Sequence, residues 1–499
     1  MLLTRTGGTA VAVMIFLSVV CSAQVPVGPD LLGTEYRERL GSTVALSADG
    51  RVMAVGSGTY PGRECCIGAV RVYGQDNYRW VQIGQTILGR DIASNWTGEA
   101  LALSDDGNTV VVTGFGDPAG GYNGYVQAYT YTGDGWVPKG QEFIGEFVPD
   151  YDRSDPQVSV SASGDTLSIG QYRSAPAEAF DGLVSVYAYQ FGRWQRVDVG
   201  AAYSFTLPFT PDHVMSRDGR TVAIRTYDHS TVKPAYRYGV AVYRLQGGRW
   251  VQLGGHLVGR SDNDEFGFDF EINDAGNRIA LVSADFGDGA DRTGRVEIYD
   301  YVDGEWVSTV QTLRPAGPPK QVFPKLAMSG NGNRISLAYG EAGAEAEVVT
   351  YEWTGRAWAM IGAIAPEGSN GLIHDQHLRL GHSANGEWLV VGNPYYSYQG
   401  ELTGGARLYY LENLTGTGDA AQVPNGIRAY PNPSAKDVRF QVAEEFSGGT
   451  VQLLGSDGRA WRRVPVGQGN LTVEGVPPGV YTLLVRNASR YARLRFLVI

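Results

Sequence analysis

Apolar and polar positions along the chain form a repeated pattern of short strands, and its first copy shows the pattern clearly. Residues 44–47 form a short apolar segment, a polar turn ends at Gly50, and residues 52–56 suit a strand buried on both faces. After a variable loop, residues 68–73 and 78–83 alternate between apolar and polar positions, as half-exposed strands do. This copy is therefore predicted to be one sheet of four antiparallel strands.

The same pattern occurs seven times. Its turn glycines follow one another at intervals of 57, 57, 55, 57, 56 and 54 residues, and in six copies a Trp comes 26 to 31 residues later. A fixed period of this length in strand-rich units is typical of a β-propeller. Because the Trp takes the same place in each unit, we interpret it as a packing residue. The glycines are Gly50, Gly107, Gly164, Gly219, Gly276, Gly332 and Gly386, and the Trp residues are Trp80, Trp136, Trp194, Trp250, Trp306 and Trp358.

The seventh copy lacks a fourth strand with its Trp, because the pattern fades after residue 410. At the other end of the chain, residues 25–33 (VPVGPDLLG) resemble residues 81–89 (VQIGQTILG), which end the first copy. We therefore predict that the N-terminal segment completes the last sheet, which closes the ring and leaves no free edge at the seam. The predicted fold is all-β, with a seven-bladed β-propeller closed by the N-terminal strand over residues 24–414.

Residues 1–23 are predicted to be a signal peptide. Arg5 precedes an apolar run, residues 11–20, that is too short to span a membrane as a helix, and Ala23 offers a small residue for cleavage. The alternative is a lipid anchor at Cys21, which a bulky preceding residue does not favour. No later segment is apolar enough to span a bilayer, so no transmembrane segment is expected after the signal is removed.

Only Cys65 and Cys66 remain once this segment is removed. Adjacent cysteines cannot join distant parts of a fold. They could form a vicinal disulfide, stay reduced or bind a metal, and a structural loop is the simplest interpretation. Stability is then expected from the core rather than from disulfide bonds.

The chain has 499 residues, among them 68 Gly and 29 Tyr, and a formal net charge of −11. From Arg428 to Ile499 there are ten Lys or Arg against five Asp or Glu, a net charge of +5 that leaves −16 for the rest. An acidic body argues against nucleic acid as a partner, because phosphate groups are bound by Lys and Arg.

Residues 428–499 follow a Gly/Thr/Ala-rich linker, residues 415–427, and show a different pattern. Their alternating segments predict a small Ig-like β-sandwich. These segments are residues 438–442, 449–458, 476–485 and 491–499.

Several motifs of this C-terminal segment occur in a fixed order. They are Tyr430, Pro431, Asn432 and Pro433, the Asp457-Gly458 turn, the segment 478–483 with Gly479 and Tyr481, and a final strand with Arg493 and Arg495. Together they resemble the type A C-terminal sorting domain of the type IX secretion system of Bacteroidota. The resemblance implies that the type IX machinery recognises the domain after export to the periplasm, and that the body is secreted or attached to the outer-membrane surface. An ordinary adhesive sandwich is the alternative.

The ring resembles bacterial propellers with degenerate repeats of the FG-GAP type over about residues 24–418. Integrin-type FG-GAP repeats carry a calcium loop of the form Asp-x-Asp-x-Asp-Gly. The turns here read Ser47-Ala-Asp-Gly50 and Ser104-Asp-Asp-Gly107, which lack the alternating carboxylates that calcium needs. No cofactor is therefore expected.

Two other features are weaker candidates for metal ions. Acidic loops at residues 261–265 and 285–291 could bind Ca²⁺, although solvated turns are the simpler interpretation. His374 and His377, with His382 nearby, have a spacing that could bind a transition metal, and a surface loop is again the simpler interpretation.

The strand order places the longer, variable loops on one face of the ring and the Gly turns on the other. The long-loop face is rich in aromatic residues, which suits the recognition of a protein or glycan, although these rings could also cover their own blades. The candidate ligand-binding residues are Tyr60, Tyr122, Tyr172, Tyr227, Tyr236, Tyr238, Tyr395, Tyr396 and Tyr398, with Phe180 and Phe286 nearby.

No Gly-x-Ser-x-Gly elbow, phosphate loop or His-Glu-x-x-His helix occurs in the sequence, so no catalytic residue is assigned. We therefore predict a non-enzymatic, secreted or cell-surface propeller that binds a protein or glycan through its long-loop face. The alternatives are a glycan hydrolase or lyase acting in the central channel and a structural surface-layer protein. Two or three carboxylates with shifted pKa values around the channel would favour the enzyme.

Overall fold

The fold was obtained as a computed structural model. It describes residues 25–27, 29–34, 36–58, 67–76, 79–89, 97–114, 124–144, 157–174, 180–197, 205–206, 212–228, 237–259, 266–286, 292–309, 312–313, 325–339, 346–364, 378–398, 401–411, 427–430, 438–442, 450–454, 460–465, 470–473, 479–486 and 491–498. Every regular element within these ranges is a β-strand, and they contain no helix that could cross a membrane. The predicted signal peptide and the Cys65-Cys66 pair lie outside the described residues.

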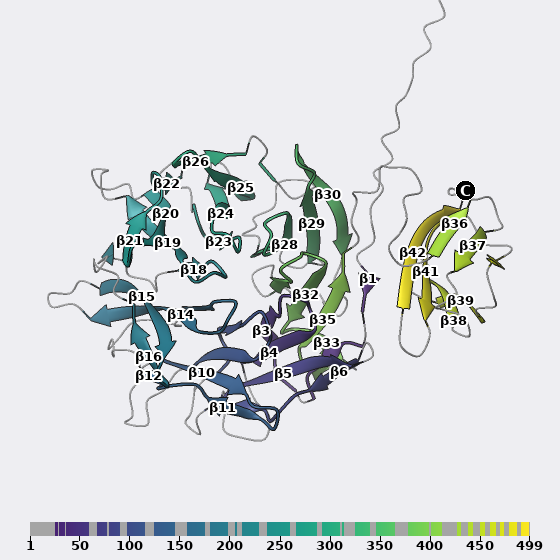
Figure 1. The fold of residues 1–499 in the computed structure, drawn as a ribbon, viewed down its shortest axis with the longest axis horizontal. Coiled ribbons are helices and arrows are strands. Elements are labelled where there is room, and N and C mark those ends of the chain that lie inside the picture. Colours follow the sequence, from purple (N-terminus) through teal and green to yellow (C-terminus); the bar gives the residue numbers. More distant parts are fainter. Residues whose placement is uncertain are drawn as a thin grey trace, which may run out of the picture.

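Seven antiparallel sheets form a ring of blades, which Figure 1 shows face-on. In each complete blade four strands follow one another from the channel outward in chain order, and in five sheets a short extra strand also pairs with the third. The predicted seven-bladed propeller is confirmed. The first three blades are β3 (Leu40–Leu46), β4 (Val52–Ser57), β5 (Ala69–Asp76), β6 (Arg79–Gln82) and β7 (Ile87–Leu88); β8 (Leu101–Leu103), β9 (Thr109–Gly114), β10 (Tyr125–Tyr131), β11 (Trp136–Pro138) and β12 (Phe143–Ile144); and β13 (Gln157–Val160), β14 (Thr166–Ser174), β15 (Phe180–Gln190), β16 (Arg193–Arg196) and β17 (Phe205–Thr206).

The remaining blades complete the ring. They are β18 (His213–Met215), β19 (Thr221–Asp228), β20 (Arg237–Gln246), β21 (Arg249–Gln252) and β22 (Leu257–Val258); β23 (Asp269–Ile272), β24 (Arg278–Phe286), β25 (Arg292–Val302) and β26 (Glu305–Ser308); β27 (Lys325–Met328), β28 (Arg334–Tyr339), β29 (Glu347–Trp353) and β30 (Trp358–Ile364); and β31 (Arg379–His382), β32 (Trp388–Asn393) and β35 (Gly405–Tyr410), which the N-terminal strands β1 (Val25–Pro26) and β2 (Leu31–Leu32) join. The short hairpin of β33 (Ser397–Tyr398) and β34 (Glu401–Leu402) lies between β32 and β35 in the sequence.

The N-terminal segment closes the ring, as the sequence predicts. In β1, Val25 lies opposite Tyr410, and in β2, Leu31 lies opposite Ala406, both on β35. An ion pair between Asp30 and Arg407 joins the same two segments. The pairing of β2 with β35 repeats that of β7 with β5 in the first blade, which explains the sequence similarity between the two segments.

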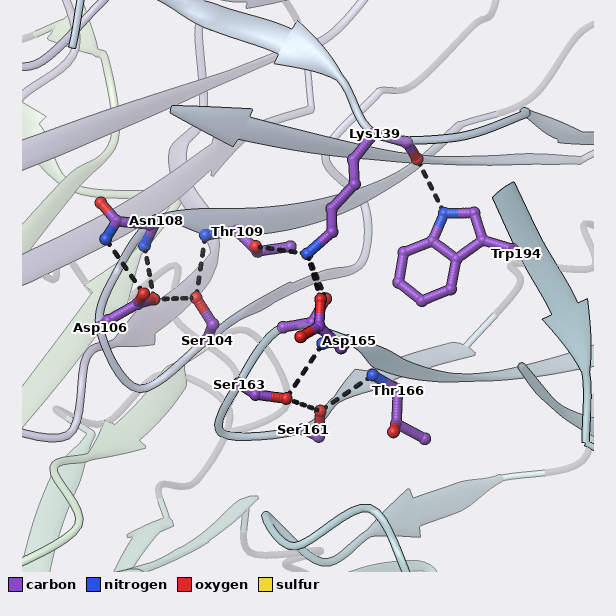
Figure 2. Close-up of polar contacts among 11 residues, drawn as sticks. Ser104, Asp106, Asn108, Thr109, Lys139, Ser161, Ser163, Asp165, Thr166 and Trp194 are labelled. Carbon is purple, nitrogen blue, oxygen red and sulfur yellow. Dashed lines mark hydrogen bonds and ion pairs between the residues drawn. The ribbon is translucent and has the colours of Figure 1, made fainter. Parts of the chain in front are cut away.

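The recurring turn is built by side chains, and Figure 2 shows it in the second blade. Ser104 Oγ donates to Asp106 Oδ1 (2.6 Å) and accepts the Thr109 N–H (2.9 Å), while Asp106 Oδ1 accepts the Asn108 N–H (2.9 Å). Short polar side chains thereby supply hydrogen bonds that organise the turn. In five other blades, a Ser Oγ likewise accepts the backbone N–H of the residue five positions later. These residues are Ser47, Ser161, Ser216, Ser329 and Ser383, and Asn273 Oδ1 accepts the equivalent N–H in the fifth blade.

The turn must end in glycine for two reasons. All seven turn glycines have φ between 64° and 75°, a conformation that side chains rarely adopt. Each turn also touches the preceding blade: a Cβ on Gly107 would lie 2.6 Å from Val52 Cβ. The repeated Gly is therefore required by contacts between blades as well as by the turn itself.

The repeated Trp residues also join neighbouring blades. Trp136 packs with first-blade residues and donates its Nε1–H to the Ile83 carbonyl (2.8 Å), while Trp194 donates to the Lys139 carbonyl (2.8 Å). Apolar contacts between adjacent sheets form the core of the ring. The interpretation of these two Trp residues as packing elements is confirmed.

Buried or half-buried cations add a connection between blades that the sequence pattern did not reveal. Lys139 Nζ donates to the Gly164 carbonyl of the next blade (2.8 Å) and pairs with Asp165 (2.9 Å), as Figure 2 shows for the ion pair. Each such cation satisfies a carbonyl that a turn would otherwise leave unpaired. The equivalent bonds run from Arg244 to Gly276 (3.0 Å), from Arg278 to Gly332 (2.9 Å) and from Arg334 to Gly386 (2.8 Å).

The C-terminal segment contains two antiparallel sheets. Each of the four predicted segments, residues 438–442, 449–458, 476–485 and 491–499, contains a strand, and three further strands were not predicted: β36, β39 and β40. The first sheet is β36 (Ile427–Tyr430), β37 (Val438–Val442) and β40 (Asn470–Val473), and the second is β39 (Ala460–Pro465), β38 (Thr450–Leu454), β41 (Gly479–Arg486) and β42 (Tyr491–Val498).

Candidate functional site in the central channel

The innermost strands of all seven blades enclose a cavity of about 410 Å³. This volume lies within the range of pockets that bind small ligands. The walls come from β3, β8, β13, β18, β23, β27 and β31, and the turns that follow six of these strands, all but β13, also line the cavity. The site is therefore a channel built from equivalent positions of seven repeats, and its chemistry depends on which residue each repeat places there.

Alignment of the repeats on their turn glycines divides the channel wall into three layers. The entrance layer, seven residues before each glycine, comprises Thr43, Ala100, Gln157, Asp212, Asp269, Lys325 and Arg379, of which Gln157, Asp212, Asp269 and Lys325 line the cavity. The middle layer, five residues before it, comprises Ala45, Ala102, Ser159, Val214, Glu271, Ala327 and Gly381. The floor layer, two residues before it, comprises Ala48, Asp105, Ala162, Arg217, Asp274, Gly330 and Ala384.

Glu271 is the one ionisable side chain of the middle layer. All seven residues of this layer line the cavity, and the other six are small or apolar, so the space in front of Glu271 is open. Within the described residues its carboxyl group has no hydrogen-bond or ion-pair partner. Because the side chain faces the cavity it is only half-buried, yet enclosure by the walls, aided by Asp269, raises its pKa to about 8. Glu271 therefore holds a proton at neutral pH.

Asp269 lies two residues before Glu271 on β23, and both side chains line the channel. Two residues of a strand span about 7 Å, and alternate residues share a face. Asp269 Oδ2 accepts the Leu326 N–H (3.0 Å) and lies 3.9 Å from Lys325 Nζ. One face of one strand thus carries a protonated carboxyl group without a partner and a second carboxyl group fixed by two partners of the next blade.

A third carboxyl group lies in the entrance layer on the neighbouring blade. Arg225 Nη1 lies 3.3 Å from Asp212 Oδ2, and the Arg225 guanidinium stands over the ring of Tyr238, 4.5 Å from its centre. Burial nevertheless raises the pKa of Asp212, with Arg225 opposing the shift. Asp212 of the entrance layer is thus paired with a cation that also contacts an aromatic ring.

The floor layer carries the remaining charges. Arg217 Nε donates to Asp105 Oδ1 (2.7 Å), and its Nη1 donates to the Leu103 carbonyl (2.9 Å). Burial raises the pKa of Asp274 to about 6, although the positive charge of Arg217 opposes the shift. Several carboxyl groups with raised pKa values therefore line one cavity, which is the feature that favours an enzyme.

The structure moves some predicted binding residues out of loops. Tyr172 lies on β14, Tyr227 on β19 and Tyr238 on β20, where the backbones of Tyr227 and Tyr238 are paired in the strand register. Their placement in loops was wrong, because these strands extend farther toward the long-loop face than the apolar pattern indicates. Tyr398 lies on the short strand β33.

Tyr395 and Tyr396 occupy the turn that follows β32. Tyr395 is half-buried, with the Arg39 guanidinium over its ring, and the Tyr396 N–H donates to the Asn393 carbonyl (3.1 Å). Tyr60, Tyr122 and Tyr236 lie outside the described residues. A role of these tyrosines in ligand binding stays a prediction.

The candidate metal ligands are only partly described. His382 lies on β31 in the wall of the channel, its Nε2 is 2.9 Å from Ser336 Oγ, and burial lowers its pKa to about 3. His374 and His377 lie outside the described residues, as do residues 261–265 and 287–291. Within the part of the chain that the structure describes, no group of three or more potential metal ligands occurs.

In the C-terminal segment, Tyr430 lies on β36, and Gly479 and Tyr481 lie on β41. Pro431, Asn432 and Pro433 are outside the described residues. Their role in sorting stays a prediction.

No protein-family model and no curated protein matches this chain. Solved propellers resemble it at low identity. The periplasmic gluconolactonase of Pseudomonas aeruginosa is 15% identical, with 85% of this chain and 100% of that chain covered and a TM-score of 0.42. The oligogalacturonate lyase of Vibrio parahaemolyticus is 10% identical, with coverages of 79% and 95% and a TM-score of 0.45. The propeller domain of the Pyrococcus furiosus Trilobed protease is 10% identical, with coverages of 79% and 97% and a TM-score of 0.44.

The prediction of a non-enzymatic protein is corrected. The similar structures include a gluconolactonase and an oligogalacturonate lyase. At these identities the likeness concerns the fold alone and names no reaction for this chain. The chemistry has to be argued from the channel.

The sequence reasoning missed Asp212, Asp269 and Glu271. Asp269 and Glu271 are alternate residues of one strand and match no known catalytic motif, whereas Asp212 comes from the preceding blade and joins them only in the common cavity. A usable signal was present: with the repeats aligned on their glycines, Glu271 is an acidic residue in a column of small or apolar ones.

Proposed function

We propose that this chain is an extracellular enzyme that hydrolyses a glycan inside the propeller channel. Glu271 acts as the general acid and Asp269 as the general base. The observation that carries the proposal is the pair itself: two carboxyl groups on one face of β23, one without a partner in an open cavity and one fixed by Lys325 and the Leu326 N–H.

The proposed reaction uses both groups once per turnover. Glu271 gives its proton to the glycosidic oxygen as the bond from that oxygen to the anomeric carbon breaks. Asp269 takes a proton from a water molecule whose oxygen bonds to the same carbon. The products are two shorter glycans, and a proton passes from Asp269 to Glu271 through solvent before the next cycle.

The environments of the two groups support these roles. A general acid must hold its proton at the working pH, and enclosure of Glu271 raises its pKa to about 8. In the proposed reaction, water activated by Asp269 displaces the leaving group in one step without a covalent intermediate, as in inverting glycosidases. We therefore expect inversion at the anomeric carbon.

The long-loop face is proposed to recognise the same glycan on its way into the channel. Tyr238 supports this, because its ring contacts Arg225, which pairs with Asp212 in the entrance layer. Aromatic rings beside polar groups are suited to sugar faces and hydroxyl groups. Binding and catalysis would then be two stages of one process.

Incubation of the intact mature chain with a panel of plant, algal and bacterial polysaccharides tests the proposal. We expect new reducing ends from one class, with the anomeric configuration of the first product read by NMR. The Glu271→Gln variant should lose this activity, whereas Glu305→Gln, on the exposed outer strand of the same blade, should keep it. Absorbance of unsaturated uronates would instead indicate a lyase, and no product from any glycan would overturn the proposal.

We also propose that residues 428–499 direct type IX export, with the body secreted or retained at the outer-membrane surface. The ordered motifs from Tyr430 to Arg495 support this proposal. Deletion of Arg428–Ile499 should leave a folded ring that accumulates in the periplasm of a host that has this secretion system. Normal surface delivery of the truncated protein would contradict it.

A further inference from the structure

The floor of the channel is held together by a belt of backbone hydrogen bonds. Six N–H···O bonds join successive turns of neighbouring blades around the ring from Asp274 to Arg217. Their lengths are 2.8 Å (Asp274 to Gly330), 2.9 Å (Asn331 to Ala384), 3.1 Å (Ala384 to Ala48), 2.9 Å (Ala48 to Asp105), 3.0 Å (Asp105 to Ala162) and 2.7 Å (Ala162 to Arg217).

This belt sets the width of the floor. Backbone segments joined by such bonds lie about 5 Å apart, so seven of them enclose a circle with a Cα radius of about 6 Å. At the two ends of the belt lie Arg217 and Asp274, where burial raises the pKa of Asp274 and the positive charge of Arg217 opposes that rise.

Side chains narrow the floor further. Arg217 extends past Ala162 of the third blade to reach Asp105 of the second, and it lies against the carbonyls of Leu103 and Val160 along the channel wall. The Asp274 carboxyl group lies over the Cα of Gly330, where a Cβ would be 2.2 Å from Asp274 Oδ2. The small residues of the layer thus make room for its three large ones.

Glu271 lies well below the entrance. It is two residues deeper than Asp269, a distance of about 7 Å along the strand. A glycan that lay flat across the entrance would not reach it. A glycan that reached Glu271 in mid-chain would have to leave through the floor or fold back beside itself in a cavity of about 410 Å³.

We propose that the channel is a blind pocket that admits a glycan by one end from the long-loop face, so the enzyme shortens its substrate from a chain end. This inference rests on the proposed function and adds the class of substrate to it: glycans with a free end. Internal bonds of a long chain do not reach Glu271. A ring-closed glycan has no end to insert.

Product lengths test this inference. The polysaccharide that gives reducing ends in the screen above is digested with the intact mature chain, and the products are separated by size at early times. We expect mono- or disaccharides beside nearly full-length polymer, and no cleavage of a cyclic oligosaccharide with the same linkage. Early products of intermediate length, or opening of the cyclic substrate, would overturn the inference while leaving the proposed hydrolysis intact. Absence of products from every glycan would overturn both.

Discussion

Arg217 of the fourth blade donates to Asp105 of the second blade, with Nε and Oδ1 2.7 Å apart, across the small Ala162 of the third. Burial raises the pKa values of Glu271 and Asp274, and the positive charge of the same guanidinium opposes both shifts. One side chain therefore narrows the floor of the channel and also influences the pKa of Glu271 above it.

The Arg217→Met variant should shift the pH profile of the proposed activity upward. Met keeps much of the length of Arg217 but removes the charge that favours the ionised form of Glu271, so Glu271 would hold its proton to a higher pH. The measurement is kcat/KM against pH, with Arg193→Met on the exposed outer strand of the third blade as the control. An unchanged alkaline limb would argue against Glu271 as the acid.

Glu271→Gln should reduce turnover by about 100-fold or more, because a positioned general acid typically contributes 10²–10⁴-fold. KM should change little, since Gln has nearly the same shape and only the transferable proton is lost. Steady-state kinetics on the identified glycan check this, and the fold is verified by the thermal transition. Equal loss in Glu305→Gln would point to a general defect instead.

The pH dependence of stability should report the raised pKa of Glu271 without any substrate. Its value of about 8 in the folded chain exceeds the ordinary value of 4.5, so its stabilising contribution is complete below about pH 4.5 and is lost as pH rises through 8. Glu271→Gln should therefore unfold at a higher temperature than the parent at pH 8–9, and the difference should vanish toward pH 4–5. Parallel curves across this range would contradict the shift.

Gly107→Ala should destabilise the ring by about 2–4 kcal/mol. Ala is strained at a φ of 71°, and its Cβ would lie 2.6 Å from Val52 Cβ in the first blade. Gly133→Ala is the matched control, because its φ is 93° but no heavy atom lies within 4 Å of the new Cβ. Urea unfolding should show the larger loss for Gly107→Ala, and similar losses would mean that the contact between blades contributes nothing.

Asp30→Asn should weaken the seam of the ring by about 1–3 kcal/mol, because Arg407 would lose its charged partner in a half-buried position. Asp49→Asn, which removes an exposed ion pair with Arg51, serves as the comparison. Limited proteolysis should then release the N-terminal segment faster in Asp30→Asn alone. Equal rates in the two variants would show that strand pairing closes the ring without the ion pair.

The periodic pattern alone determines the number of blades, their strand order and the closure by residues 25–33. It does so because each blade is a local structure: turn glycines such as Gly107 and packing residues such as Trp136 keep fixed positions in every repeat. The bonds from a cation to a turn-glycine carbonyl of the next blade, such as that from Lys139 to Gly164, follow the same period. The sequence pattern did not reveal these bonds, because the cation differs between blades in type and position.

The candidate site was decided by the tertiary structure. Asp212, Asp269, Glu271 and Arg217 lie in two adjacent repeats, yet their common cavity exists only because seven inner strands meet around one axis. The pKa of Glu271 likewise depends on walls supplied by other blades, since burial is a property of the closed ring. Residue spacing shows which position a side chain takes in its own blade. The enclosure that shifts the pKa of a carboxyl group arises only when the other blades surround it.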